Sequence, residues 1–205
     1  MDFNTLVSAD TVTKTAAALN EHGFKSIVAS TGAEALEKIK EIIPAGASVM
    51  NGSSATLQQI GFVDLLKSGA HGWNNLHDGI LAEKDPGKQG ELRKQAVHAD
   101  YFLASAHAIT QGGEIIVANA SGSSLPSLAY TSKNIILVVS TKKIVSNLET
   151  GLARIREHIF PLEDQRMKDT GASGTMMAKI LILEREPSFM GRTVHVIFVN
   201  EDLGF

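Results

Sequence analysis

The sequence predicts an α/β protein in which helices cover both faces of a largely parallel sheet. Three observations predict this fold. Short apolar runs typical of strands alternate along the chain with helical patterns. The run Ile135–Val139 is apolar at every position, as is typical of a strand that is covered on both faces. Polar turns follow several of the predicted strands, where helices of such folds begin. We therefore expect a three-layer α/β/α architecture.

The first half of the chain supplies alternating elements. Apolar positions at helical spacing predict a helix over residues 4–21, which Gly23 ends, and residues 24–29 form a β-rich run. A second helix begins at Ser30–Gly32 and ends before Pro44. Residues 48–50 predict a brief strand, and a helical pattern follows from Thr56 to Leu66. The Gly-, Asn- and Asp-rich residues 68–89 indicate a surface excursion without a readable conformation.

The second half continues in the same way. Strands are predicted over residues 101–104, 114–118 and 134–140, and helices over residues 91–99 and 148–159, the latter ending before Pro161. The β-rich runs 179–183 and 193–199 lie close together and are expected to form a partly antiparallel edge. No repeat, low-complexity tract or linker divides the chain, so we expect one domain over residues 1–205.

Composition excludes several classes of function. The chain has 205 residues, a formal net charge of −3 and no clustered basic runs, which argues against nucleic acid as a partner. It contains no cysteine, which excludes disulfides, thiolate zinc sites, cysteine nucleophiles and any Cys-ligated iron–sulfur cluster. The N-terminus lacks a signal-peptide pattern and the apolar runs are too short to span a bilayer. We expect a cytoplasmic protein that does not enter the membrane.

The first candidate turn follows the strand at residues 48–50. It contains Asn51, Gly52, Ser53, Ser54 and Thr56. Glycine allows a ligand close to the backbone, and hydroxyl and amide groups can bind a phosphate or carboxylate. An ordinary helix cap explains the same residues equally well. The turn has neither a Gly-Lys-Ser/Thr phosphate loop nor a Gly-x-Gly-x-x-Gly dinucleotide pattern, so it does not predict nucleotide binding by either route.

The second candidate turn lies between the strands at residues 101–104 and 114–118. His107 could act as an acid or base near neutral pH, and Glu114 could act as an acid, base or nucleophile. Gln111, Gly112 and Gly113 complete the turn and could bind a ligand through their amides. Neither His107 nor Glu114 has an identifiable partner in the sequence, which favours a structural role for both.

The third candidate turn follows the strand at residues 114–118. Asn119, Ser121, Gly122 and Ser123 could form a concave wall of backbone amides and hydroxyls, or simply a surface loop. Lys143, beyond the end of the strand at 134–140, could add positive charge to an anion site or be an ordinary solvated lysine. Our structural hypothesis is that the three turns converge on one pocket.

No metal site is predicted. Four residues are of types that could ligate a metal ion, but their spacing fits no recognised ligand pattern. We expect them to be ordinary surface side chains. They are His71, His77, Asp78 and His98.

Long stretches of the chain resemble the LUD (lactate-utilisation) family, which includes lactate-utilisation protein C. The similarity runs through NGSSATLQQIG, ADYFLASAHAIT, GGEIIVANASGSSLPSLAY, IILVVSTKKIV, NLETGLARIREHIFPLEDQRM, KILILEREP and VNEDLGF. The resemblance implies a fold similar to coenzyme A transferases, ribose phosphate isomerase and glucosamine phosphate deaminase. It also implies a part in lactate utilisation, beside an iron–sulfur system that converts lactate to pyruvate.

The chain departs from the family pattern at two places. Several members carry an acidic residue where this chain has Gln111, and an amide cannot replace a carboxylate as a base. Longer relatives have clustered cysteines near the region matched here by residues 169–179, where this chain has none. Since it also lacks a flavin or nicotinamide fingerprint, partner redox subunits would have to carry electrons.

Three functions follow from these observations. The leading hypothesis is a LUD-family protein that binds a small anionic metabolite or cofactor of unknown identity and supports lactate and organic-acid utilisation. The first alternative is a transferase or isomerase that uses Glu114. The second is a non-catalytic assembly subunit of an oxidation complex, which the replacement at Gln111 favours.

Overall fold

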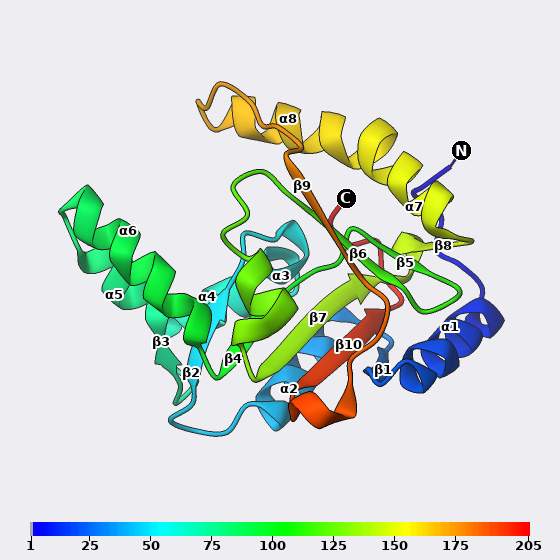
Figure 1. Ribbon diagram of the computed structural model, residues 1–205, viewed down its shortest axis with the longest axis horizontal. Helices are drawn as coiled ribbons and strands as arrows, with labels where there is room; N and C mark the ends of the chain where they lie inside the picture. Colours follow the sequence, from blue (N-terminus) through cyan, green and yellow to red (C-terminus); the bar gives the residue numbers. More distant parts are fainter. Residues whose placement is uncertain (1) are drawn as a thin grey trace.

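A six-stranded sheet in which all neighbouring strands run parallel forms the centre of the computed structural model, which describes residues 2–205 (Figure 1). The strand order is β1-β10-β7-β4-β2-β3. The strands are β1 (Lys25–Ala29), β2 (Ser48–Asn51), β3 (Asn74–Asn75), β4 (Tyr101–Ala104), β7 (Asn134–Ser140) and β10 (Thr193–Val199). The α/β class and the largely parallel sheet are thus confirmed.

Strand β7 lies in the interior of this sheet and is buried on both faces. Ile135, Leu137 and Val139 belong to one hydrophobic core, and the alternating residues Ile136 and Val138 belong to another. Side chains of a strand point alternately to opposite faces, so an unbroken apolar run requires a cover on each side. The strand predicted over residues 134–140 is confirmed with the same bounds.

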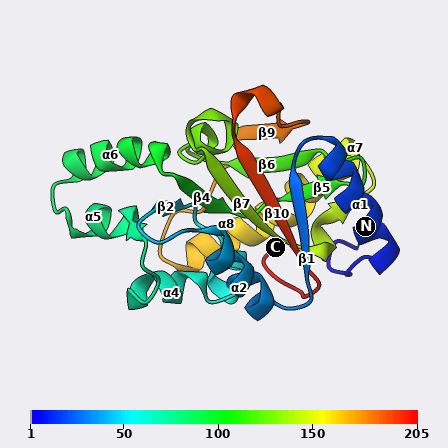
Figure 2. The ribbon, with the colours of Figure 1, turned by 90° about the horizontal axis from the view of Figure 1, so that it is seen from below.

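Helices α2 (Gly32–Ile42), α3 (Ala55–Gln59) and α4 (Phe62–Ser68) cover one face of the sheet (Figure 2). The sequence predicts one helical stretch from Thr56 to Leu66, but the structure divides it in two. Gly61 adopts a left-handed conformation with φ = 80° between α3 and α4. Because only glycine takes this conformation without a steric penalty, the helix ends and a new one begins there.

Helix α1 (Ala9–Glu21) and a second sheet cover the opposite face. The second sheet has the order β8-β5-β6-β9. Its strands are β5 (Ala108–Thr110), β6 (Ile115–Asn119), β8 (Ile144–Val145) and β9 (Lys179–Leu183). Its inner side chains Ile109, Ile115 and Val117 pack with Val12 and Leu19 of α1 against the main sheet. This cover completes the three-layer arrangement.

The two late β-rich runs do not form one edge. Strand β9 pairs antiparallel with β6 at an edge of the second sheet, as expected for an antiparallel edge strand. Strand β10 instead lies between β1 and β7 in the main sheet and runs parallel to both, so the expectation was wrong for this strand. The reason is two-sided burial, because Val196 and Phe198 face one core and Ile197 and Val199 face the other.

A long helical rod lies over the outer face of the second sheet (Figure 1). It consists of α7 (Leu148–Ala153), a π-helical segment η4 (Arg154–Ile159) and α8 (Phe160–Asp169). The prediction that the helix ends before Pro161 was wrong. Proline lacks a backbone N–H and disrupts i→i+4 bonding, but here it lies in the first turn of α8, directly after a π segment that already departs from that pattern.

The excursion over residues 68–89 is partly helical. Helix α5 (Leu76–Ala82) and helix α6 (Pro86–Gln95) form a hairpin beyond the β3 edge of the sheet, and η1 (Ala96–His98) follows (Figure 1). The short helical segments η2 (Ser127–Thr131), η3 (Thr141–Lys143) and η5 (Ser188–Met190) connect other strands. Across residues 2–205, the length and apolarity that a bilayer-crossing helix needs are not found together in any helix.

A pair of glycine substitutions tests how the C-terminal end of α1 is held. Gly23 has φ = 88°, and a Cβ added there would lie 2.3 Å from the carbonyl oxygen of Glu186. Gly46 has φ = 81°, and apart from its chain neighbours no atom of residues 2–205 lies within 4 Å of a Cβ added there. We expect Gly46→Ala to cost about 1 kcal/mol for the left-handed backbone and Gly23→Ala a further ~1–3 kcal/mol for the clash. Urea unfolding measures both, and equal costs would contradict the close approach of Glu186.

Candidate functional site

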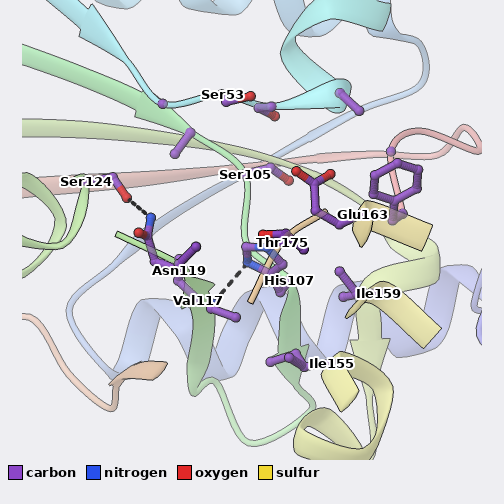
Figure 3. Close-up of a pocket in the computed structure, with 18 of the residues that line it drawn as sticks. Ser53, Ser105, His107, Val117, Asn119, Ser124, Ile155, Ile159, Glu163 and Thr175 are labelled. Atoms are coloured by element: carbon purple, nitrogen blue, oxygen red, sulfur yellow. Dashed lines mark hydrogen bonds between the residues drawn. The ribbon is translucent and has the colours of Figure 1, made fainter. Parts of the chain in front are cut away.

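A cavity of about 480 Å³ lies at the carboxyl ends of the main strands, between these ends, the second sheet and helix α8 (Figure 3). The turns after β2 and β4 form one wall, and Lys143 of η3, just beyond β7, adds to it. The turn after β6 and Thr175, in the segment before β9, complete the polar part of the lining. Ligands of open parallel sheets bind at this end of the strands. The cavity is therefore the candidate functional site.

The turn after β2 lines the cavity through Gly52, Ser53, Ser54 and Thr56. Ser54 Oγ accepts a hydrogen bond of 3.2 Å from the backbone N–H of Leu57, so this residue caps α3, as its alternative explanation predicts. No intramolecular hydrogen bond engages the exposed Ser53 hydroxyl within the described chain, and Figure 3 shows this residue beside the cavity.

Asn51 lies just behind this turn and is not part of the cavity wall. Its side-chain amide donates to the carbonyl oxygen of Gly52 at 3.1 Å. Its own carbonyl oxygen lies 3.0 Å from Nε2 of His77. Asn51 therefore has a supporting position beside the turn that lines the cavity.

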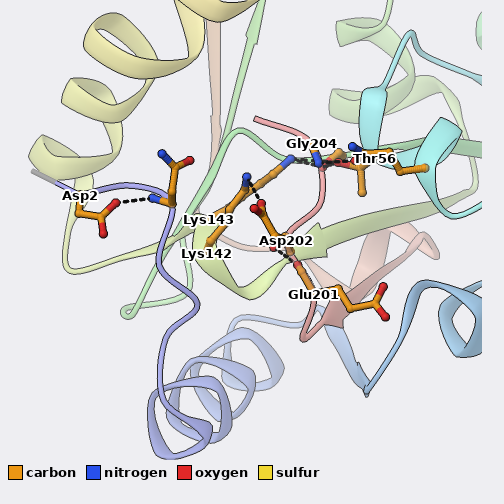
Figure 4. Close-up of polar contacts among 11 residues, drawn as sticks. Asp2, Thr56, Lys142, Lys143, Glu201, Asp202 and Gly204 are labelled. Atoms are coloured by element: carbon orange, nitrogen blue, oxygen red, sulfur yellow. Dashed lines mark hydrogen bonds and ion pairs between the residues drawn. The ribbon is translucent and has the colours of Figure 1, made fainter.

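Lys143 lines the cavity and is only 4% exposed. Figure 4 shows its ammonium beside Thr56. Its ammonium Nζ donates to Thr56 Oγ1 at 3.1 Å and to Ser105 Oγ at 3.2 Å. Among residues 2–205 no carboxylate forms a salt bridge with it. Burial lowers the pKa of Lys143 to about 7, with smaller contributions from the charges of Arg154 and Lys142. It is not the solvated surface lysine of the alternative hypothesis.

The neighbouring Lys142 provides a contrast within the same short helix. It is also buried, with 6% of its surface exposed, but its Nζ pairs with the carboxylate of Asp202 (Figure 4). The charge of Lys142 is thus compensated within the chain, whereas the ammonium of Lys143 donates only to hydroxyl groups among the described residues.

His107 also lines the cavity, at the start of β5. Its Nδ1 accepts a hydrogen bond of 3.2 Å from the backbone N–H of Ala118, which places the proton of the neutral ring on Nε2. Burial lowers the pKa of His107 to about 3, assisted by the charges of Lys143 and Arg154. The imidazole is therefore neutral near pH 7 and can donate from Nε2.

Arg154, which the sequence did not single out, lies behind His107. It is fully buried, its Nη1 donates to the carbonyl oxygen of His107 at 2.7 Å, and its guanidinium lies 5.9 Å from the ring centre of Phe3. Its Nε and Nη2 have no hydrogen-bond partner in the described part of the chain. Burial lowers the pKa of Arg154 to about 10, so it stays charged near neutrality and adds positive potential to the inner end of the cavity.

The turn after β6 forms a further wall. Asn119, Ser121 and Ser123 line the cavity. The side-chain amide of Asn119 donates to Ser124 Oγ at 2.7 Å (Figure 3), and the hydroxyls of Ser121 and Ser123 lie 3.0 Å apart. Gly122 does not line the cavity, because its α-carbon faces the side chain of Lys179.

Residues Gln111–Glu114 lie away from the cavity. The N–H of Gln111 donates to Val145, and Gly113 packs against the backbone of Ala18 in α1. The carboxylate of Glu114 accepts from the hydroxyl of Thr110, with Gly112 packed beside it. The pairing of the strands explains this placement. Strands β5 and β6 are antiparallel, so the start of β5 and the end of β6 share one end of the sheet, and the hairpin turn lies at the other.

The rod formed by α7, η4 and α8 lines the remaining side of the cavity, which sequence analysis missed because it ended this helix before Pro161. Apolar residues dominate this side. They are Ile155, Ile159, Phe160 and Met167 of the rod, joined by Met176 and Met177 of the segment before β9. Glu163 and Arg166 also line it and form a bidentate ion pair, with distances of 2.6 and 2.7 Å. The i, i+3 spacing of these two residues is typical of an ordinary ion pair on a helix surface, so it did not predict that they line a cavity.

The histidines considered for a metal site are dispersed. His71 stacks on Trp73, and His77 contacts the carbonyl oxygen of Asn51. Within residues 2–205 there is no group of three His, Asp or Glu side chains arranged to hold a metal ion.

Of the comparisons with known proteins, one supports the fold and another shows the family. This chain is similar in structure to a DUF162 family protein from Deinococcus radiodurans, whose crystal structure superposes with a TM-score of 0.57 at 13% sequence identity. The match covers 96% of this chain and 100% of the other. A search of curated proteins found no significant match. The likeness to coenzyme A transferases stays a prediction. The LUD domain model matches residues 12–199, and the chain therefore belongs to the LUD domain family.

Proposed function

We propose that this protein binds a small organic acid in the cavity, with the carboxylate of the acid paired to the ammonium of Lys143. One observation carries the proposal. Lys143 is a buried cation that faces a cavity, and within residues 2–205 its hydrogen-bond partners are the hydroxyls of Thr56 and Ser105 alone. Burying a charge without a counter-charge is costly, and a bound carboxylate would supply that counter-charge.

The surroundings of Lys143 suit an anion that carries a second polar group. The fully buried Arg154 adds positive potential, and the Nε2–H of neutral His107 is a hydrogen-bond donor. The hydroxyls of Ser53 and Ser105 and the turn containing Asn119 and Ser121 line the same cavity. A 2-hydroxy or 2-oxo acid has both the charge and the neighbouring oxygen that such a site could hold.

Membership of the LUD domain family supports a role related to lactate utilisation. In that role the protein would bind the acid and deliver it to, or receive it from, partner redox subunits. Such subunits are needed because the chain contains no cysteine to hold an iron–sulfur cluster. The partners, any cofactor and the expected cytoplasmic location stay predictions.

The two alternatives have less support. An isomerase or transferase that uses Glu114 requires its carboxylate at the ligand, but Glu114 and the amides of Gly112 and Gly113 lie at the far end of the β5–β6 hairpin. A purely structural assembly subunit would not require an uncompensated lysine inside a cavity, because a buried apolar side chain is less costly there.

Replacing Lys143 tests the site directly. We expect Lys143→Met to weaken binding of lactate or pyruvate roughly ten- to a hundred-fold, because a charge-assisted hydrogen bond is lost. The fold should persist, since methionine fills the space without a buried charge. Lys142→Met is the matched control, because Lys142 is equally buried but paired with Asp202. Calorimetric titration measures both, and an unchanged affinity in Lys143→Met would rule out the proposed carboxylate contact.

The pH dependence of binding provides a second test. The pKa of Lys143 is about 7, so the ammonium loses its proton as the pH rises through this value, while His107, with a pKa of about 3, stays neutral. The acid itself stays ionised, so its affinity should fall as the pH is raised from about 6 to about 9. Lys143→Met should show a flat profile over this range. An affinity that rises with pH in the wild-type protein would contradict the proposed pairing.

A further inference from the structure

The cavity has an apolar half that the small acids of the proposed function would leave uncovered. Ile155 and Ile159 lie on the inner side of the helical rod and are buried beside β5 and β6. Phe160, Met167 and Met177 are half-buried and line the same space. Figure 3 shows Ile155 and Ile159 on the side of the cavity opposite Ser53 and Ser105. Polar and apolar groups are therefore segregated across the cavity.

The two halves differ in depth. Lys143 is 4% exposed at the inner end, whereas Met176 is 67% exposed on the segment that leads into β9. A carboxylate paired with Lys143 would thus lie deep, and the rest of the molecule would extend outward along the methionines. Methionine side chains are flexible and polarisable, and they adapt to apolar groups of different shapes.

The charges that face the apolar half do not oppose an apolar tail. Glu163 accepts from Nε and Nη2 of Arg166 at 2.7 and 2.6 Å, so this carboxylate is neutralised by its neighbour on the same helix. The cavity volume of about 480 Å³ falls within the range of roughly 300–1,000 Å³ typical of sites for drug-sized ligands. The methyl group of lactate would contact only part of the apolar wall.

We infer that the ligand of this protein is a carboxylic acid with a hydroxyl or keto group at C2 and an extended apolar tail, aliphatic or aromatic, which packs against Ile159, Met167 and Met177. This inference rests on the proposed function, since it assumes that Lys143 holds the carboxylate. It names a substrate class larger than lactate or pyruvate. The tail would gain affinity by leaving water for the apolar wall.

A chain-length series tests the inference. Straight-chain 2-hydroxy acids from lactate to 2-hydroxyoctanoate, together with phenyllactate, are titrated calorimetrically into the wild-type protein. Each added methylene should raise the affinity about two- to four-fold, because full burial of a methylene contributes up to ~0.8 kcal/mol. The gain should stop when the tail reaches solvent beside Met176. Phenyllactate should bind more tightly than lactate.

A matched pair of variants locates the contact. Met177→Gln keeps the length of the side chain but makes the apolar wall polar, so it should flatten the chain-length dependence by lowering the affinity for long-chain acids more than the affinity for lactate. Met190→Gln is the control, because Met190 is 37% exposed and lies outside the cavity. Equal affinity for all chain lengths in the wild-type protein would overturn the inference and leave the proposed function intact. Failure of every acid to bind would overturn both.

Discussion

The two-sided burial of β7 constrains both the fold and the cavity. Its side chains alternate between two hydrophobic cores, so helices must cover one face and α1 with the second sheet must cover the other. The strand ends at Ser140, which is itself buried, and η3 follows immediately. Lys142 and Lys143, both in η3, are buried as well.

This burial determines what each lysine does. Lys142 finds a carboxylate in Asp202, which follows the neighbouring strand β10. Lys143 lines the cavity, and in the described part of the chain its ammonium donates only to the hydroxyls of Thr56 and Ser105. The positive charge of Lys143 would pair with a carboxylate, and the apolar wall along α8 would pack against an apolar tail on the same ligand. The LUD family name suggests lactate, whereas the extent of the apolar wall suggests a larger relative of lactate.

Sequence patterns predicted those features of the fold that depend on neighbouring residues along the chain. The apolar run of β7 predicted its bounds and its interior place, and the turn after β2 was recognised from its polar residues. The position of Gln111–Glu114 could not be predicted in this way. It depends on the antiparallel pairing of β5 with β6, which separates His107 from Glu114. The burial of Arg154 beside the cavity could not be predicted either, because it depends on packing of the rod against the second sheet.

The protonation state of Lys143 tests the central claim most directly. Nuclear magnetic resonance of the side-chain resonances of Lys143 would follow its titration without ligand and with a saturating 2-hydroxy acid, and the Lys143→Met variant would assign the signal. We predict titration near pH 7 without ligand, because burial of the ammonium lowers the pKa of Lys143, and a clear rise of the pKa when the carboxylate binds. A Lys143 pKa that the bound acid leaves unchanged would contradict the account.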